Sequence, residues 1–388
     1  MRRTAGAGLR GGPRRRHAGV AAAAAALAGA LLALGGPGPR AALPEPAQGA
    51  SASAAATAPA HLADTGLYAD AATRRVAPDV LPFTPQYPLW SDGAAKRRWI
   101  RLPPGTAIDA SDPDAWVFPV GTRLWKEFSF GRRVETRYME RLADGTWRFA
   151  AYAWTPDGAD ALLVPERGLR AAAESRPGLS YDIPSVYDCR ACHEGGPTAV
   201  LGFSSLQLSS DRDPLAVHAE RPGPGHVDLP ALLERGLVRG LPQALLDRPP
   251  RIDAPTGRAR AALGYLHVNC GICHDSRGQL ASLGLSLVQR VAARGGADAA
   301  LATASDVPSR FRPPGTGAAA PVRIRPGRPA DSVLVARMAS RDPLVQMPPL
   351  GSRAVDDEAV ALVSAWISGL RPGATTLSRS NHPKEEAR

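Results

Sequence analysis

Cysteine is scarce in this chain of 388 residues, and two short motifs use all of it. The four cysteines lie within residues 189–193 (CRACH) and 270–274 (CGICH). No thiol remains for a disulfide, so the sequence excludes a fold held together by disulfides. Methionine is equally rare, with four residues, and lysine occurs only at positions 96, 126 and 384.

Each motif has the CxxCH spacing of covalent c-type haem attachment. The two thiols lie one helical turn apart and can add across the vinyl groups of a porphyrin, while the adjacent histidine can ligate the iron. Two motifs therefore predict two covalently attached c-type haems. The residues predicted to hold them are Cys189, Cys192, His193, Cys270, Cys273 and His274.

Two other uses of the cysteines fit less well. Zinc ribbons close a loop of about 15–20 residues between their CxxC pairs, whereas the second pair here begins 81 positions after the first (270 minus 189). Zinc binding would also leave the histidine after each pair unexplained. A redox dithiol needs a βαβ context, and the sequence around the motifs has no such pattern.

Residues 1–40 have the composition of an export signal. Arginines precede an apolar run from Ala18 to Leu34 that is rich in alanine and interrupted by glycine. Such a run is more typical of a secretory signal than of a stable membrane span, with an uncleaved anchor as the alternative. We therefore expect that the mature protein has no stable membrane span. We also expect a periplasmic location, because c-type haem is attached outside the cytoplasm.

The positive charge of the chain is concentrated in this N-terminal segment. The formal net charge is +11, and residues 1–40 contain seven arginines and no acidic residue, which leaves +4 (11 minus 7) for the rest. Haem propionates would lower this charge further. The basic pI therefore does not predict nucleic-acid binding.

The remaining sequence predicts an α+β multidomain protein. An N-terminal β-rich domain, expected to be a small sandwich, precedes a small haem-binding segment and an all-α cytochrome c domain. The expected boundaries are 41–62 for a flexible linker, 67–174 for the β-rich domain, 176–251 for the first haem-binding segment, 252–372 for the cytochrome c domain and 377–388 for a disordered tail.

Alternating polarity predicts strands in the β-rich domain. One strand is expected from Arg133 to Leu142, Asp144-Gly145 supplies a tight hairpin turn, and Trp147 to Trp154 returns with the aromatic content typical of strands. Six of the seven tryptophans lie in this domain and are expected to form its core. The charged residues expected to form a solvated face are Asp92, Lys96, Lys126 and Glu127.

Helix signals are clearest in the cytochrome c domain. One helix is expected from about Thr256 into the second motif, another from Val333 to Ala339, and a third after an N-cap at Asp356. Gly264 on the first of these helices would let the last helix cross it closely, with Trp366 packed at the crossing.

Met347 is the predicted sixth iron ligand at the second motif. It lies in the sequence Met347-Pro-Pro-Leu-Gly351, downstream of His274, and the flanking prolines stiffen the loop that presents it. A thioether is a soft, neutral donor that raises the haem potential. The alternative is that Met347 only fills space in the core.

The sixth ligand at the first motif is less explicit, because no Met-Pro-Pro loop follows it. The candidates are His267, then Met139 and Met338. His267 lies three residues before Cys270, where it could point towards the other haem. Each candidate also has a simpler explanation, as a helix-surface or packing residue, and the remaining possibility is that no side chain ligates this iron.

The chain resembles the di-haem c-type cytochromes of proteobacteria that carry an N-terminal β-domain. The resemblance rests on Lys96-Arg-Arg-Trp-Ile-Arg-Leu-Pro103, Trp125-Lys-Glu-Phe128, Val134-Glu-Thr-Arg137, Tyr265-Leu-His-Val-Asn-Cys270 and Met347-Pro-Pro-Leu-Gly351, and it covers about residues 80 to 371. It implies a periplasmic electron carrier with periplasmic or membrane-bound redox proteins as partners, and it implies no particular substrate.

Two classes of function follow from these observations. The first is single-electron transfer with both irons six-coordinate. The second resembles di-haem cytochrome peroxidases, in which one haem is open to a small substrate and a nearby acid or base assists bond cleavage; Glu194, His218 and His226 are the candidates for that group. A third possibility is that the β-rich domain only docks the haem-binding part onto a partner.

Overall fold

The structure is a computed structural model that describes residues 57–292, 296–314 and 320–373. The predicted export signal, the linker up to residue 56 and the predicted tail at 377–388 lie outside the described residues. Residues 59–62, which the sequence assigned to the linker, are bonded to the protein: the Tyr152 hydroxyl donates to the Pro59 carbonyl at 2.9 Å, and the Leu163 amide donates to the Ala60 carbonyl at 2.9 Å.

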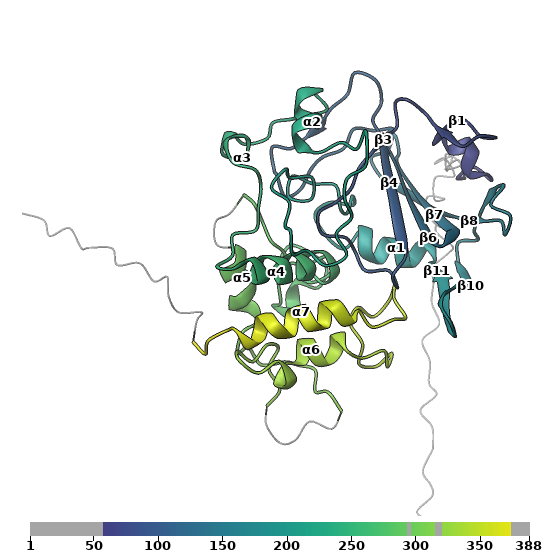
Figure 1. The fold of residues 1–388 in the computed structure, drawn as a ribbon. Helices are drawn as coiled ribbons and strands as arrows, with labels where there is room; N and C mark the ends of the chain where they lie inside the picture. The colour runs from purple at the N-terminus through teal and green to yellow at the C-terminus, as the bar shows by residue number, and fades with distance from the viewer. Residues whose placement is uncertain (1–56, 293–295, 315–319, 374–388) are drawn as a thin grey trace, which may run out of the picture. The chain divides into compact units, whose positions relative to one another are not determined.

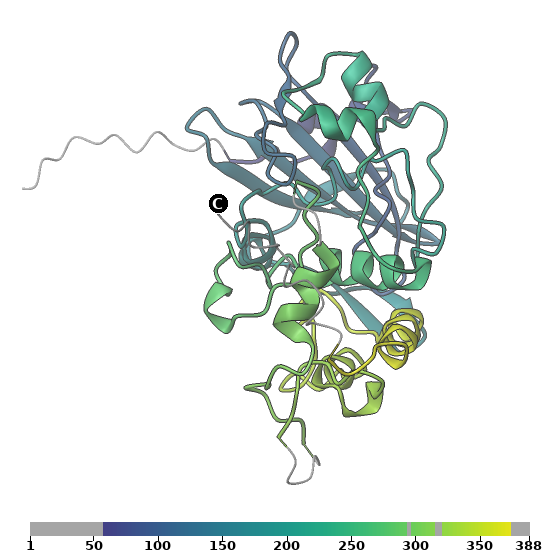
Figure 2. The same ribbon diagram turned by 90° about the vertical axis from the view of Figure 1, so that its left-hand side faces the viewer.

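The chain is an α+β protein in which an antiparallel sheet precedes a mixed region with several helices (Figure 1). The main sheet has six strands in the order β3 (Leu81–Pro82), β4 (Ala95–Arg101), β6 (Arg123–Phe130), β7 (Arg132–Arg141), β8 (Trp147–Trp154) and β9 (Ala161–Leu163). Figure 2 shows the long strands side by side from a second direction.

Three short two-stranded sheets accompany the main one. They pair β1 (Tyr68–Asp70) with β2 (Arg75–Val76), β5 (Ile108–Asp109) with β12 (Val238–Arg239), and β10 (Leu169–Arg176) with β11 (Leu179–Ile183). The described strands thus form one large sheet with small additions instead of the two large packed sheets of a sandwich.

The predicted hairpin is confirmed. β7 and β8 are antiparallel neighbours, with Arg141 paired to Trp147 at the closed end. Gly145 in the connecting turn has a φ of 82°, a left-handed conformation that glycine adopts without steric cost.

The two faces of the sheet bury different cores. On the outer face, Trp99, Trp125 and Tyr138 pack with residues 62–80. On the inner face, Leu124, Met139 and Phe149 pack with residues 200–241. The tryptophans are core residues as expected, and the sheet separates them because neighbouring positions along a strand point to opposite faces. Of the six tryptophans in the predicted β-rich domain, five are buried: Trp99, Trp116, Trp125, Trp147 and Trp154.

The prediction of a solvated charged face was wrong at two positions. Glu127 is 3% exposed and accepts hydrogen bonds from the Arg97 guanidinium at 2.9 and 2.6 Å. Asp92 is also buried, and its carboxylate accepts the backbone amides of Arg353 and Ala354 at 2.9 and 2.8 Å. Both carboxylates find partners that are remote in sequence, so the local pattern does not reveal their burial.

The helices begin where their capping residues predict. The Thr256 hydroxyl accepts the Ala259 amide at 3.1 Å, and the Asp356 carboxylate accepts the Ala359 amide at 3.1 Å. The helices are η1 (Leu62–Thr65), α1 (Val186–His193), α2 (Leu229–Glu234), α3 (Gln243–Asp247), α4 (Gly257–Asn269), η2 (Ala281–Leu283), α5 (Gly296–Ala304), η3 (Pro329–Asp331), α6 (Val333–Met338) and α7 (Asp357–Ser368). Within the described ranges, no helix has the length and apolar character needed to cross a membrane.

Gly264 has a different neighbour from the one expected. A Cβ atom at this position would lie 2.1 Å from Cε1 of Tyr87, so the glycine admits the Tyr87 ring and not α7. Helix α7 still packs against α4, where Val363 and Trp366 share a buried cluster with Leu263. Helix α4 therefore makes its close approach at Gly264 to the segment between β3 and β4 of the main sheet.

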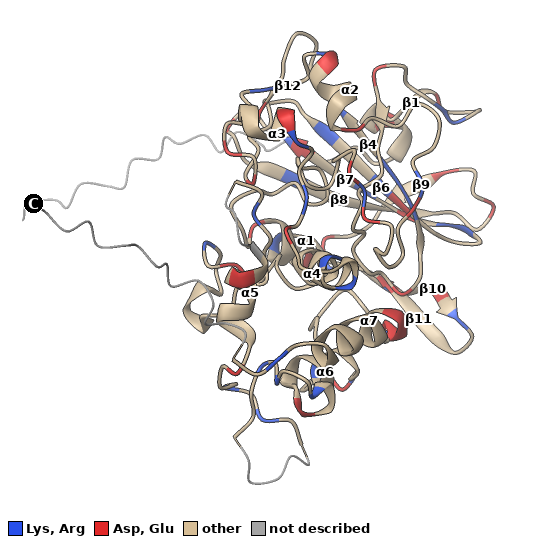
Figure 3. Cartoon of the chain, turned by 60° about the vertical axis from the view of Figure 1, so that its left-hand side comes forward, with Lys and Arg blue, Asp and Glu red and all other residues tan. Residues whose placement is uncertain are grey.

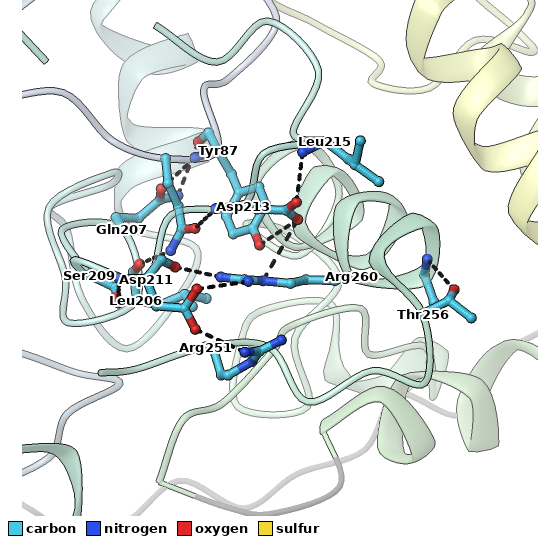
Figure 4. Close-up of polar contacts among 12 residues, drawn as sticks. Tyr87, Leu206, Gln207, Ser209, Asp211, Asp213, Leu215, Arg251, Thr256 and Arg260 are labelled. Atoms are coloured by element: carbon cyan, nitrogen blue, oxygen red, sulfur yellow. Dashed lines mark hydrogen bonds and ion pairs between the residues drawn. The ribbon is translucent and has the colours of Figure 1, made fainter. Parts of the chain in front are cut away.

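A buried arginine on α4 joins this helix to the segment that follows the first motif (Figure 4). Arg260 donates to the Asp211 carboxylate at 3.0 Å and lies 3.8 Å from the Asp213 carboxylate. Asp213 in turn accepts the Tyr87 hydroxyl at 3.0 Å. Segments from three regions of the chain thus meet at one guanidinium.

We expect Arg260→Ala to destabilise the protein by about 3 kcal/mol, because it leaves the carboxylates of Asp211 and Asp213 without their shared cation. The free energy of unfolding, measured by chemical denaturation, tests this. Arg258→Ala is the matched control, since Arg258 is exposed on the same helix. Equal losses in the two variants would contradict a bridging role for Arg260.

Candidate haem-binding sites

The first motif lies on the short helix α1. Its start is fixed by a capping box: the Ser185 hydroxyl accepts the Asp188 amide at 3.1 Å, and the Asp188 carboxylate accepts the Ser185 amide at 2.9 Å. Cys189 is buried in the core on the inner face of the sheet, and α1 lies against β8. The inner face of the sheet therefore packs against the first motif.

His193 is oriented by two contacts. Its Nδ1 lies 2.6 Å from the Ala199 carbonyl oxygen, which can only accept, so Nδ1 carries the proton and the Nε2 lone pair is free. Its ring lies 5.3 Å from the Phe149 ring. Burial lowers the pKa of His193 to about 4, which keeps the imidazole neutral. This is the tautomer that an iron ligand needs.

The second motif begins where α4 ends. The Asn269 side chain accepts the Trp90 amide at 2.8 Å and donates to the Tyr265 carbonyl at 3.1 Å, which fixes the last turn of the helix. Burial raises the pKa of the next residue, Cys270, to about 12, so its thiol is neutral. The His274 amide donates to the Cys270 carbonyl at 2.9 Å and so closes the motif into a single turn.

A cavity of about 350 Å³ adjoins the second motif. Cys270, Cys273 and His274 line it on one side, and Met347 and Met338 also face it. Its volume lies in the range of small-molecule and cofactor sites, about 300–1,000 Å³. Two thiols, an imidazole and a thioether on one cavity are the donor set that a c-type haem requires, so the residues fit this group.

The Met347 loop is anchored to α6. The Met347 amide donates to the Arg337 carbonyl at 3.0 Å, and Nε of Arg337 donates to the Val345 carbonyl at 2.8 Å. The Arg337 guanidinium lies 4.2 Å from the centre of the Phe311 ring. Protein contacts alone therefore hold Met347 at the cavity.

The sequence did not single out the three arginines that line this cavity, Arg310, Arg323 and Arg337, of which the last two affect His274. Arg323 donates to the carbonyls of Leu283 and Gly284 at 2.6 Å each, and Arg337 lies beside it on the cavity wall. Burial and then the charges of these arginines lower the pKa of His274. No spacing rule marks such residues, because they reach the cavity from separate segments.

The segments that directly follow the two motifs contact each other, although the motifs begin 81 positions apart (270 minus 189). The Gln279 amide donates to the Gly195 carbonyl at 3.1 Å, and its side chain donates to the Glu194 carbonyl at 3.1 Å. Burial, and then the nearby Cys273, raise the pKa of the Cys192 thiol to about 11.

The three candidates for the remaining ligand are widely separated. The His267 Nδ1 accepts the Gln289 amide at 3.2 Å, so the neutral ring has its proton on Nε2 and no free lone pair. Met338 lines the cavity of the second motif. Met139 shares the inner-face core with Cys189 and is paired with Phe149 across β7 and β8.

The three candidates for a distal acid or base have other partners. Glu194 is exposed and lies 3.9 Å from Arg190. His218 pairs with the Asp356 carboxylate at 2.8 Å. His226 is bonded to the Thr84 hydroxyl at 2.7 Å.

Comparisons of the chain with known protein families, curated proteins and solved structures found no match. The role of the cysteines therefore has to be inferred from the sequence and the geometry of this chain. Within the part of the chain that the structure describes, no three His, Cys, Asp or Glu side chains are grouped closely enough to hold a metal ion by themselves. A four-cysteine zinc site would require such a group.

We expect Gly278→Ala to destabilise the contact between the motifs by about 1–3 kcal/mol, because the added Cβ would lie 2.6 Å from the Gly195 carbonyl oxygen. Chemical denaturation gives the free energy of unfolding. Gly196→Ala is the control, since the nearest atom to its Cβ is 4.0 Å away. If both variants are as stable as the wild type, the two segments are not in tight contact.

Proposed function

We propose that the protein is an exported di-haem c-type cytochrome that passes single electrons between redox proteins of the periplasm or its bounding membranes. The observation that carries the proposal is the contact between the segments that directly follow the two CxxCH motifs, made by Gln279 with Gly195 and Glu194. Two cofactors attached at touching segments are close enough to exchange electrons within one chain.

Each haem would be bound through a pair of cysteines, Cys189 with Cys192 and Cys270 with Cys273. When bound, these haems supply a reversible one-electron couple. His193 and His274 would each present a neutral imidazole. Met347 would complete the second site, where a thioether favours the reduced iron and raises the potential.

Met139 is the strongest of the three candidates for the sixth ligand of the first haem. It shares a buried cluster with Cys189, whereas His267 uses its Nδ1 to accept a backbone amide and Met338 belongs to the other cavity. The inner face of the sheet would then be a wall of the first haem site. This role goes beyond that of a separate docking module.

The contacts of the distal candidates favour an electron carrier over a peroxidase-like enzyme. Such an enzyme needs an acid or base that faces the open side of the iron. His218 and His226 are already hydrogen-bonded to Asp356 and Thr84, and Glu194 extends to the surface. None of these side chains is free to serve that role in the arrangement described.

The haem content tests the proposal directly. The intact mass of protein purified from the periplasm should exceed the mass of the polypeptide by two haems. Cys189→Ala and Cys270→Ala should each weaken the attachment of one haem and leave the other in place. A mass that corresponds to one haem, or to bound zinc, would refute the di-haem proposal.

We expect Met347→Ala to abolish the weak long-wavelength absorption of a ferric iron–thioether bond and to lower the potential of one haem only. Optical spectra and a redox titration of the purified protein measure both effects. Met338→Ala is the matched control, because Met338 lines the same cavity from α6. If both variants keep the band, then Met347 only packs against the cofactor.

A further inference from the structure

Four cationic side chains share the inner face of the sheet. In the strand register, Arg98 of β4 is paired with Lys126 of β6, and Lys126 is paired with Arg137 of β7. Lys96 lies two positions before Arg98 and therefore points to the same face. We call these residues the inner-face cation cluster; the basic segments of the strands are blue in Figure 3.

Among the residues that the structure describes, only two carboxylates pair with this cluster, and both are engaged. Arg98, with a side chain 5% exposed, donates from Nη1 to Glu220 at 2.7 Å, while its Nη2 is buried without a hydrogen-bond partner. Arg137 donates to Glu135 at 2.6 Å. Glu135 also accepts the Tyr181 hydroxyl at 2.6 Å, so it has little capacity left for another cation.

The two lysines have no anionic partner. Among the described residues, neither the Lys96 ammonium nor the Lys126 ammonium takes part in an ion pair or a hydrogen bond. The Lys126 ammonium has only the Phe128 ring, whose centre lies 5.0 Å away and which also faces the Arg137 guanidinium at 4.4 Å. Burial lowers the pKa of Lys126 and that of Lys96, to about 8 for Lys96.

The inner-face cation cluster adjoins the first motif. Arg137 is paired with Ala151 in β8, two positions from Phe149, whose ring contacts His193. Burial is the main cause that lowers the pKa of His193, and the charges of Lys126 and Arg137 lower it further, whereas the hydrogen bond with the Ala199 carbonyl raises it. The cations are therefore near the histidine as well as near one another.

A purely structural role does not account for this arrangement. Lys96 and Lys126 are half-buried, and a cation withdrawn from water without a partner is destabilising, whereas apolar side chains at such positions are often neutral or stabilising. The neighbouring positions Leu124 and Met139 show that this same face packs well with apolar residues. An anion placed among the ammonium and guanidinium groups would offset the cost.

We propose that Lys96, Arg98, Lys126 and Arg137 form a binding site for a carboxylate or small oxyanion beside the first CxxCH motif. The anion has two possible sources. It is either a free small anion or a propionate of the haem attached at this motif, and the second source rests on the proposed function.

Titration calorimetry of the complete protein at low ionic strength tests the free-anion source, with acetate, nitrate and phosphate as probes. The wild type should bind one equivalent of at least one probe. Lys126→Gln should weaken binding at least about tenfold, the loss of one charge-assisted hydrogen bond. Lys126→Arg, which keeps the charge, should bind nearly as well as the wild type.

Arg132→Gln is the charge-matched control, because Arg132 is exposed at the start of β7. It should bind the probes as the wild type does. Circular dichroism establishes that each variant is folded, and Lys96→Gln provides a second test of the site if Lys126→Gln does not fold.

The propionate source predicts a different result. No free anion binds, and Lys126→Gln lowers the potential of one haem, because a nearby cation stabilises the reduced form. Without the Lys126 ammonium beside it, the propionate has a higher pKa. The potential of that haem therefore becomes dependent on pH between about pH 5 and about pH 8, where the propionate titrates. The wild type and Arg132→Gln should not show this dependence.

The proposal is overturned if the wild type binds none of the probes and the potentials of Lys126→Gln match those of Arg132→Gln at every pH. The haem content, measured first by intact mass, separates this failure from failure of the proposed function. If the protein contains no haem but binds a probe through Lys126, the proposed function fails and the anion site stands. If it contains no haem and binds no probe, both proposals fail.

Discussion

The contact between the segments that follow the two CxxCH motifs is the constraint on which the rest of the structure depends. Gln279 reaches both Gly195 and Glu194, so the end of α1 must lie against the loop that follows α4. The segments between the motifs therefore have to fold back on themselves. The buried Arg260, which joins α4 to Asp211 and Asp213, stabilises that return.

The main sheet serves two purposes because its faces differ. Its outer face is closed by aromatic packing around Trp125 and Tyr138. Its inner face changes along the strands from an apolar part, with Leu124 and Met139, to the inner-face cation cluster around Lys126. The apolar part packs against Cys189, whereas the cationic part supplies charge next to His193. The sheet that the sequence described only as a core therefore also packs against the first CxxCH motif.

Local sequence patterns predicted the elements well. The Asp144-Gly145 turn and the caps at Thr256 and Asp356 were correct, because hairpin turns and helix ends depend on the residues beside them. Predictions that needed a distant neighbour failed. Gly264 admits the ring of Tyr87 instead of α7, and Glu127 is buried by pairing with Arg97.

By itself, the sequence determined the α+β class, the hairpin of β7 and β8, the starts of α4 and α7, and the two sets of cysteine and histidine that mark the motifs. Only the tertiary structure decided that the motifs touch, that Met347 and His274 face one cavity, and that Lys126 joins Arg98 and Arg137 on one face. The physical reason is that spacing along a chain fixes neighbours within one turn or one strand pair. Packing between segments remote in sequence fixes burial, charge environment and the choice among possible ligands.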